Sequence, residues 1–243
     1  MRPFPRDFAA ILTPKGRRVL DGRAAAYCGA LAAPERNFLL LDGAIDRAWA
    51  ARAHDALARS LLRHMALLAE PVPPESITFQ TRNHQERLRK TARVRTAYLV
   101  RRDSRAWAAA EGLGLIAMMG SPAYRRFAEI LAGRKLARRF GRQVLAYGPG
   151  DYAGPHTDHH PEDARARDGY VDVHITLGAP DVAHQYLVYA RDGHFSEIVN
   201  VNRPGAIAAY RLPFWHYTTP LEAKPGREAT ARRFVILGTF LYE

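Results

Sequence analysis

The chain has 243 residues, of which 47% are hydrophobic and 25% are charged, a composition typical of a folded globular protein. Its 36 lysines and arginines outnumber its 24 aspartates and glutamates, which gives a formal net charge of +12. The single cysteine, Cys28, excludes an intrachain disulfide and a cysteine-based zinc or iron–sulfur site. No apolar run approaches the roughly 20 residues that cross a bilayer, and residues 1–20 carry no sustained apolar segment. We therefore expect a cytoplasmic protein without a membrane span or secretory signal.

Two clusters of basic residues, over residues 82–105 and residues 125–142, carry much of the positive charge. Such clusters can bind nucleic acid or acidic ligands. The aromatic residues here are not interleaved with the arginines as they are on a base-stacking surface. We interpret the clusters as solvated faces, which argues against a nucleic-acid partner.

The chain begins with a lead-in over residues 1–37 that is punctuated by proline and glycine, and we expect the main domain over residues 38–243. Residues 38–43 form an apolar run that ends in Asp-Gly, which predicts a short buried strand and a turn. Apolar residues then recur at helical spacing over residues 44–70, so one helix is predicted there, ended by Pro71.

Strand and helix patterns alternate in the next part of the chain. Short strands are predicted over residues 77–79 and 94–100, and a helix over residues 104–119. Ser121-Pro122 is typical of a helix start, with an N-cap residue followed by proline at the first helical position. A further helix is therefore expected from there to about Gly133.

After residue 142 the sequence changes to short β-rich runs separated by Gly, Pro and Asp turns. Strands are predicted over residues 143–147, 170–177, 185–190, 195–201, 205–211, 215–218 and 232–242. Closely spaced strands of this kind are typical of a sandwich or barrel, and the glycine motifs of Rossmann and P-loop folds are absent. Helices first and strands later predict an α+β fold: a double-stranded β-helix (jelly-roll, cupin-like) core with N-terminal helices packed on one sheet.

One stretch combines residue types that bind metals. Residues 146–158 run from a strand through a Gly/Pro turn to His156-Thr157-Asp158. On extended backbone, residues two apart point to the same side, so His156 and Asp158 can hold one ion together. His216, on another predicted strand, is a third candidate ligand. Two histidines and one carboxylate on one face of an iron leave three positions open, as in the facial triad of non-haem Fe(II) oxygenases.

The last predicted strand begins with Arg232 and Arg233 and then runs apolar. An arginine buried on such a strand requires an anion, and the planar guanidinium suits a carboxylate bound through two hydrogen bonds. The two arginines cannot both point inward from a strand. Arg227, on a Gly-containing loop, is a third option.

Together these motifs resemble those of the iron(II)/2-oxoglutarate-dependent dioxygenases, specifically their prolyl-4-hydroxylase-like branch. That branch has tyrosines and a glycine before His-x-Asp, a later histidine followed by proline, and an arginine on the final strand. The matching residues here are Tyr147, Gly150, Tyr152, His156-Thr157-Asp158, His216 with Pro220-Leu221, and Arg233. The resemblance covers residues 38–243, is strongest over residues 144–240, and selects Arg233 because an aromatic and a branched residue follow it.

The resemblance implies the cofactors and their ligands. Fe(II) is held by His156, Asp158 and His216, and 2-oxoglutarate chelates it through its C1 carboxylate and keto oxygen. The distal carboxylate of 2-oxoglutarate pairs with Arg233, helped by Tyr147, and Thr176 is a further candidate contact. O₂ is consumed, succinate and CO₂ are released, and a substrate C–H bond is hydroxylated. The presence of a carboxylate ligand argues against a halogenase.

Candidate substrate contacts surround the metal motif: Tyr152, His159, His160 and His174. His174 follows His156 too closely to be the third metal ligand of the family, so we interpret it as a core or pocket histidine. His159 and His160 directly follow the motif, where the mouth of the pocket is expected.

We expect the substrate to be a small molecule, an amino acid or a biosynthetic intermediate, because the chain has no repeats and no appended peptide-binding domain. The first alternative is a peptidyl or prolyl hydroxylase. The alternative from another class is a non-catalytic nucleic-acid-binding β-barrel that uses the basic clusters. The long gap between His216 and Arg233 resembles the nucleic-acid repair branch, but that branch has a second arginine where Thr239 stands here. The sequence gives no indication of oligomeric state.

Overall fold

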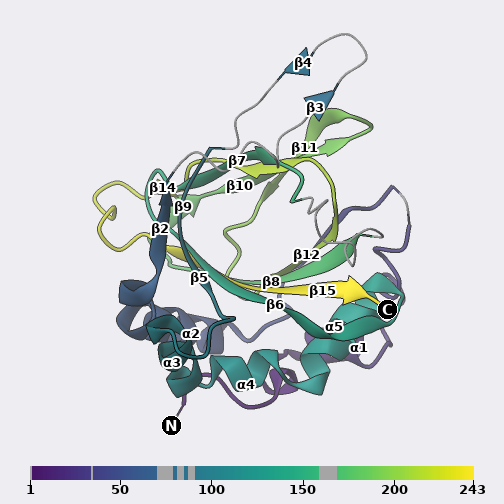
Figure 1. The fold of residues 1–243 in the computed structure, drawn as a ribbon, viewed down its shortest axis with the longest axis horizontal. Helices are drawn as coiled ribbons and strands as arrows, with labels where there is room; N and C mark the ends of the chain where they lie inside the picture. The colour runs from purple at the N-terminus through teal and green to yellow at the C-terminus, as the bar shows by residue number, and fades with distance from the viewer. Residues whose placement is uncertain (1, 34, 70–78, 81–84, 87–90, 159–168) are drawn as a thin grey trace.

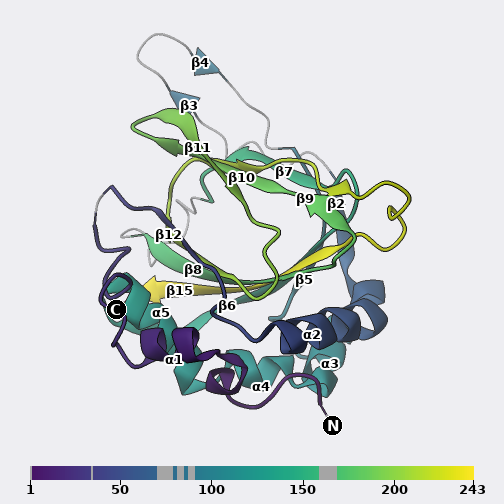
Figure 2. The same ribbon diagram turned by 180° about the vertical axis from the view of Figure 1, so that it is seen from behind.

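An antiparallel β-sheet curls around the interior of the molecule, and helices cover one side of it (Figure 1 and Figure 2). The structure is a computed structural model that describes residues 2–33, 35–69, 79–80, 85–86, 91–158 and 169–243. Along the sheet, the order of neighbouring strands is β1 (Phe38–Leu41), β12 (Ile207–Leu212), β8 (Tyr170–Gly178), β15 (Arg233–Tyr242), β6 (Leu136–Tyr147), β5 (Ala92–Tyr98), β7 (Tyr152–His156), β13 (His216–Thr218), β10 (Tyr186–Arg191) and β11 (His194–Asn200). Smaller pairings join β2 (Ala66–Ala69) to β5, β9 (Val182–His184) to β14 (Glu222–Ala223), and β3 (Phe79–Gln80) to β4 (Gln85–Glu86).

The sheet folds over into two facing halves (Figure 1). We call β1, β12, β8, β15 and β6 the helix-covered half, and β7, β13, β10 and β11 the opposite half. β5 joins the two, because its residues 95–98 pair with β6 whereas Ala92 and Arg93 pair with β7. Two facing antiparallel sheets with this strand order form a double-stranded β-helix. The predicted α+β fold with a jelly-roll core is confirmed.

Side chains of the helix-covered half alternate between two environments, as the pleat of a strand requires. On β8, the apolar residues Val171, Val173, Ile175 and Leu177 belong to the large core beneath the helices. The residues between them, Asp172, His174 and Thr176, therefore face the interior between the two halves. β8 thus brings a row of polar side chains into the interior.

The helices pack against the outer face of this half, as predicted (Figure 2). They are η1 (Phe8–Ile11), α1 (Pro14–Leu20), α2 (Arg47–Ser60), η2 (Leu62–His64), α3 (Arg105–Leu113), α4 (Leu115–Met119) and α5 (Pro122–Ala132). Side-chain oxygens cap five of them, from Asp7, Thr13, Asp46, Ser104 and Ser121. Among the described residues, none of these helices is long and apolar enough to span a membrane.

Residues of the lead-in contribute to the same core. Phe8 packs against the rings of Tyr124 and Phe127 on α5, and its backbone N–H donates to Ser121 Oγ at 3.1 Å. On the sheet side, the Tyr124 hydroxyl donates to the carbonyl of Val173 at 2.8 Å. These contacts connect the chain start, α5 and β8, while the division at residues 37 and 38 stays a prediction.

The helix predicted over residues 44–70 is wrong in its second half. α2 ends at Ser60, and after the turn of η2 the chain becomes extended and pairs with β5 as β2. Leu67 and Leu68 are 46% and 38% exposed, so these apolar residues do not continue a buried helix face. Helical spacing predicted a helix because the spacing carries no information about the open edge of β5.

The single helix predicted over residues 104–119 is also wrong, because α3 and α4 are separated by Gly114. This glycine has φ of +89°, a left-handed conformation that ends a helix. A Cβ at this position would lie 2.4 Å from the carbonyl oxygen of Phe4. The chain start therefore passes close to the break and leaves room only for glycine.

The remaining predicted elements are confirmed with shifted ends. The helix after Ser121 stops at its left-handed C-cap Gly133, and the predicted strands correspond to β1, β5, β6, β8, β10, β11, β12, β13 and β15. β6 begins at Leu136, seven residues before the predicted start at residue 143. Of the strand predicted over residues 77–79, the first two residues lie outside the described residues.

Candidate active site

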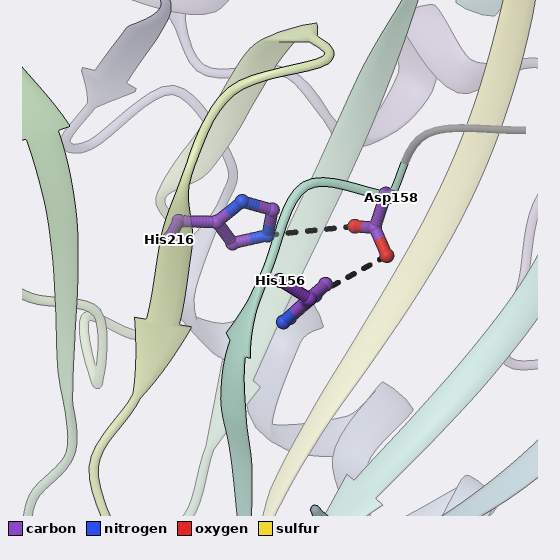
Figure 3. A group of neighbouring side chains, drawn as sticks. All are labelled: His156, Asp158 and His216. Carbon is purple, nitrogen blue, oxygen red and sulfur yellow. Dashed lines mark ion pairs between the residues drawn. The ribbon is translucent and has the colours of Figure 1, made fainter. Parts of the chain in front are cut away.

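His156, Asp158 and His216 form one cluster at the opposite half of the sheet (Figure 3). β7 and β13 are antiparallel neighbours, and their register places His156 directly opposite His216, with ring centroids 4.3 Å apart. Asp158 has φ of +53°, a left-handed conformation in which aspartate is enriched over most other non-glycine residues. Its Oδ1 lies 3.2 Å from His156 Nε2, and its Oδ2 lies 3.4 Å from His216 Nε2. One potential ligand atom from each residue lies within 4.8 Å of the others.

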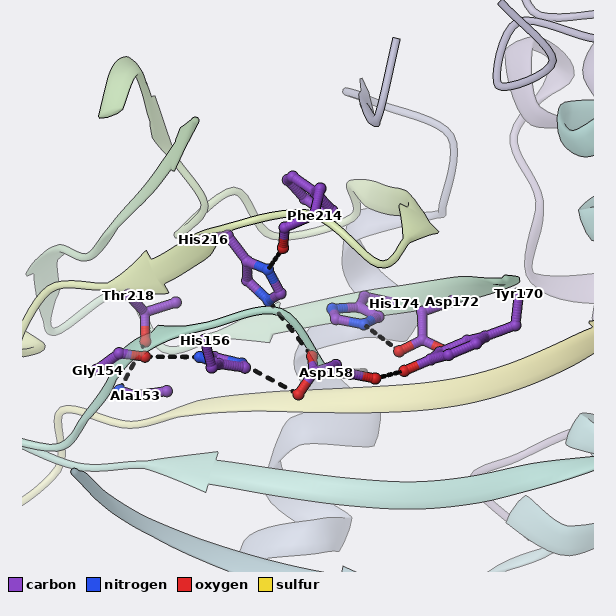
Figure 4. Close-up of polar contacts among 10 residues, drawn as sticks. All are labelled: Ala153, Gly154, His156, Asp158, Tyr170, Asp172, His174, Phe214, His216 and Thr218. Carbon is purple, nitrogen blue, oxygen red and sulfur yellow. Dashed lines mark hydrogen bonds and ion pairs between the residues drawn. The ribbon is translucent and has the colours of Figure 1, made fainter. Parts of the chain in front are cut away.

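Backbone carbonyls determine which ring nitrogen of each histidine carries its proton. His156 Nδ1 lies 2.6 Å from the Gly154 carbonyl oxygen, and His216 Nδ1 lies 2.9 Å from that of Phe214 (Figure 4). A carbonyl oxygen only accepts, so each Nδ1 is the protonated donor. Each ring then directs its Nε2 toward the Asp158 carboxylate, so one cation can be held between the three side chains. This donor set of two imidazoles and one carboxylate fits Fe(II).

Aromatic side chains surround the histidines on the interior side. The Phe214 ring stacks on His216 at 4.7 Å, and Tyr210 contacts the same imidazole edge-on at 5.4 Å. Tyr170 donates its hydroxyl to the backbone carbonyl of Asp158. These residues fix the ligand side chains and limit the access of water around them.

Arg233 lies buried in the interior, with 3% of its surface exposed. It begins β15, in register with Tyr147 of β6 and Gly178 of β8. Its Nε donates to Gln185 Oε1 at 2.8 Å, and its guanidinium carbon lies 4.9 Å from the centre of the Tyr147 ring. Among the described residues, no carboxylate pairs with this guanidinium and no hydrogen bond uses its two terminal nitrogens. A buried cation of this kind fits a carboxylate ligand.

Two phenols accompany the guanidinium. Burial lowers the pKa of Arg233, and the Tyr147 and Tyr210 hydroxyls oppose this shift. Burial raises the pKa of both tyrosines, with Arg233 as the main opposing influence. Both phenols therefore stay protonated and offer O–H donors near the guanidinium, so this end of the interior is built for an anion.

Gln185 was not singled out from the sequence. It is fully buried, and its Nε2 donates to the carbonyl oxygens of Asp151 at 3.2 Å and Thr219 at 3.0 Å. These two bonds fix the amide so that its Oε1 faces Arg233. The one sequence signal was a polar residue at the start of an apolar strand. Tyr210 was also missed, because only the pairing of β12 with its neighbours places its ring beside the histidines.

The structure separates the other predicted site residues into three groups. Thr176 is buried on the interior face of β8. It lies two residues along the strand from Gly178, the register partner of Arg233. Tyr152 is half-buried at the start of β7. His174 is not part of the cluster of potential metal ligands and instead packs its ring on Tyr210 at 4.2 Å. The predicted contacts His159 and His160 lie outside the described residues.

The competing arginines face elsewhere. Arg227 is exposed and lies 3.9 Å from Asp181. Arg232 is half-buried on a different side of the chain from Arg233, and burial together with Arg95 lowers its pKa. Arg233 is therefore the arginine that the strand turns inward.

The described members of the basic clusters belong to β5, α3, α5, β6 and the turns beside them. Arg82, Arg87, Arg89 and Lys90 lie outside the described residues. Several other members pair with carboxylates: Arg93 with Asp151, Arg101 with Asp103, and Arg125 with Glu129. Such pairs support the interpretation of the described members as solvated faces.

Comparison with known proteins gives no matching family model and no matching curated protein. Solved structures do share the fold. An oxidoreductase of the 2OG-Fe(II) oxygenase family from Burkholderia pseudomallei superposes with a TM-score of 0.57 at 16% identity, over 89% of this chain and 90% of that one. The non-haem alpha-ketoglutarate-dependent epimerase SnoN of nogalamycin biosynthesis also gives 0.57 at 16% identity, over 93% and 84%. A Trichoplax adhaerens prolyl hydroxylase, solved with a hypoxia-inducible-factor peptide fragment, gives 0.51 at 14% identity, over 91% and 90%.

Proposed function

We propose that this chain, which has the fold of the Fe(II)/2-oxoglutarate oxygenases, is an enzyme of that kind that hydroxylates a C–H bond of a small molecule. The observation that carries the proposal is the pairing of two incomplete sites in one interior. One is the metal-ligand cluster, and the other is the Arg233 guanidinium, which pairs with no carboxylate in the described part of the chain. 2-Oxoglutarate matches both, because it has a chelating keto acid at one end and a free carboxylate at the other.

Tyr210 and Tyr147 link the two sites. The Tyr210 ring contacts His216, and its hydroxyl interacts electrostatically with Arg233. The Tyr147 hydroxyl interacts with Arg233 and with Asp158. Both phenols therefore lie within range of the two ends at once, as residues around a short dicarboxylate would.

The chain's own residues account for binding and orientation. His156, Asp158 and His216 would hold Fe(II), which supplies the O₂ chemistry that couples decarboxylation of 2-oxoglutarate to substrate oxidation. The carbonyls of Gly154 and Phe214 hold the two imidazoles in the tautomer that ligation needs. Arg233, oriented by Gln185, binds the distal carboxylate, and the surrounding aromatic rings exclude water.

The polar side chains of β8 inside the barrel support a small-molecule substrate. One of them, His174, contacts the Tyr210 ring, which in turn contacts His216. SnoN, a protein of the same fold, is named for nogalamycin biosynthesis, whereas the Trichoplax enzyme was solved with a peptide. Peptidyl hydroxylation is therefore the alternative within this chemistry. Succinate release with amino acids against proline-containing peptides separates the two.

Anaerobic titration of Fe(II) and 2-oxoglutarate into the purified protein tests the proposed chemistry. A visible metal-to-ligand charge-transfer band that requires both components is expected. His216→Ala should abolish the band, and Arg233→Ala should weaken it at a fixed 2-oxoglutarate concentration. Matched controls are His184→Ala, which removes a partly exposed histidine paired with Glu222, and Arg232→Ala. A folded, metal-binding protein that gives no band overturns the proposal.

A further inference from the structure

Asp172 and His174 form a polar pair inside the barrel that the proposed chemistry does not use. Both project from β8 toward the interior, beside Tyr170 and on the same side as the metal-ligand cluster (Figure 4). The Tyr210 ring lies against His174 at 4.2 Å and against His216 at 5.4 Å. One phenol ring therefore separates the pair from a residue that we assign to the metal.

The pair lacks partners among the described residues. Asp172 Oδ1 and His174 Nε2 are both buried without a hydrogen bond. Asp172 Oδ2 lies 3.8 Å from His174 Nε2, too far for a hydrogen bond, and only 7% of the Asp172 side chain is exposed. No described lysine or arginine pairs with this carboxylate. A buried charge without a partner among the described residues is costly, so this position favours a cationic group beside Asp172.

We propose that Asp172 and His174 bind an ammonium group of the substrate, which makes the substrate class a primary amine or amino acid. This inference rests on the proposed function and adds the substrate class to it. A carboxylate only accepts hydrogen bonds, and an ammonium group offers three donors and the compensating charge. His174 Nε2 supplies a second acceptor when its Nδ1 carries the proton. The tilted ring contact with Tyr210 holds the imidazole, so the His174 acceptor is in place before the ligand binds.

Two other roles would use the same residues differently. If His174 is protonated and simply neutralises Asp172, the pair is structural and its loss destabilises the fold. If His174 binds 2-oxoglutarate, substitution of the pair weakens 2-oxoglutarate binding. The isosteric, neutral variant Asp172→Asn separates these roles from amine binding.

Ligand-induced thermal stabilisation tests the inference without relying on turnover. The probes are the L-amino acids and linear diamines, each compared with its N-acetyl derivative, added to the anaerobic protein loaded with Fe(II) and 2-oxoglutarate. At least one amine should raise the melting temperature of the wild-type protein, and acetylation should remove the shift. In Asp172→Asn the half-saturating concentration of that amine should rise at least tenfold. The inference is overturned when no amine distinguishes the wild-type protein from this variant.

Stability without added amine gives a second readout. Asp172→Asn should raise the melting temperature by roughly 2–5 °C, because it removes a buried charge that no described residue hydrogen-bonds at Oδ1. The matched control is Asp151→Asn, since Asp151 is also buried but accepts from Gly148 N at 2.7 Å and Arg93 Nε at 3.0 Å. That control should lower the melting temperature. An equal fall in both variants would assign Asp172 a structural role and overturn the inference.

The charge-transfer titration distinguishes failure of this inference from failure of the proposed function. Asp172→Asn should give the band with 2-oxoglutarate affinity within twofold of the wild-type value. If the charge-transfer band is normal but no amine distinguishes the wild-type protein from Asp172→Asn, the ammonium site is rejected and the oxygenase is not. A missing band in the wild-type protein rejects the oxygenase, and thermal stabilisation by amines still reports on the ammonium site.

Discussion

The two faces of the helix-covered half differ in how completely their side chains are satisfied, although the same strands supply both. On the outer face, Phe234 and Ile236 of β15 lie fully buried in a continuous apolar core. On the inner face, no described residue gives their neighbour Arg233 a carboxylate partner or donates a hydrogen bond to Asp172 Oδ1. The outer face therefore supplies the stability that permits such polar groups on the inner face, and we propose that those groups mark where ligands bind.

The largest expected effects come from two adjacent residues of β15, one on the outer face and one on the inner face. Phe234→Ala should lower the free energy of unfolding by about 3–5 kcal/mol, because it leaves a cavity in a fully buried region beside His54. Arg233→Leu should lower that free energy far less, because loss of the Nε bond to Gln185 is offset by removal of a buried charge that pairs with no described carboxylate. Chemical denaturation of both variants measures these changes.

Binding of 2-oxoglutarate should show the reverse pattern in the same two variants. Arg233→Leu should abolish measurable binding, whereas folded Phe234→Ala should bind within twofold of the wild-type protein. A large loss of stability in Arg233→Leu would contradict the assignment of the inner face to ligand binding.

Substitution of Gln185 should have an intermediate effect on 2-oxoglutarate binding, because this side chain contacts the Arg233 guanidinium and acts on the ligand only through it. Gln185→Ala should weaken 2-oxoglutarate binding about tenfold, as expected for loss of one hydrogen bond to a charged group. As a positioning residue, Gln185 should affect the KM for 2-oxoglutarate and leave kcat nearly unchanged. An equal fall in kcat with an unchanged KM would show that its role is not to orient Arg233.

Local sequence patterns were sufficient for the parts of the site that depend on local geometry. His156 and Asp158 share one short stretch, so extended backbone and spacing predicted that they meet. The family resemblance selected His216 and Arg233, and the structure brings His216 to the cluster and turns Arg233 inward. Helix starts followed equally local rules, as the Ser121 cap shows.

The missed features depend on residues that are distant in sequence. Gln185 faces Arg233 only because β10 and β15 lie across the interior from each other, and no spacing encodes that. The break at Gly114 depends on the approach of Phe4, more than a hundred residues earlier. β2 forms because β5 offers an open edge. Each result comes from tertiary packing, which overrides local propensity.

The smallest expected effects come from two buried tyrosines, one on each face. Tyr124 donates its hydroxyl to the Val173 carbonyl in the outer core, whereas the Tyr210 hydroxyl makes no hydrogen bond to a described residue. Tyr124→Phe should therefore lower the free energy of unfolding by about 1 kcal/mol and leave 2-oxoglutarate binding unchanged. Tyr210→Phe should leave stability unchanged and weaken 2-oxoglutarate binding by about two- to fivefold.

The same substitution on two faces isolates the hydroxyl, because each variant keeps its ring and its packing. Denaturation midpoints and anaerobic 2-oxoglutarate titrations, measured on both variants, give four values with opposite expected patterns. Loss of stability in Tyr210→Phe would mean that its hydroxyl is satisfied by the protein itself. The inner face would then be a polar part of the core, and the distinction between the two faces would fail at the residue that links the metal-ligand cluster to Arg233.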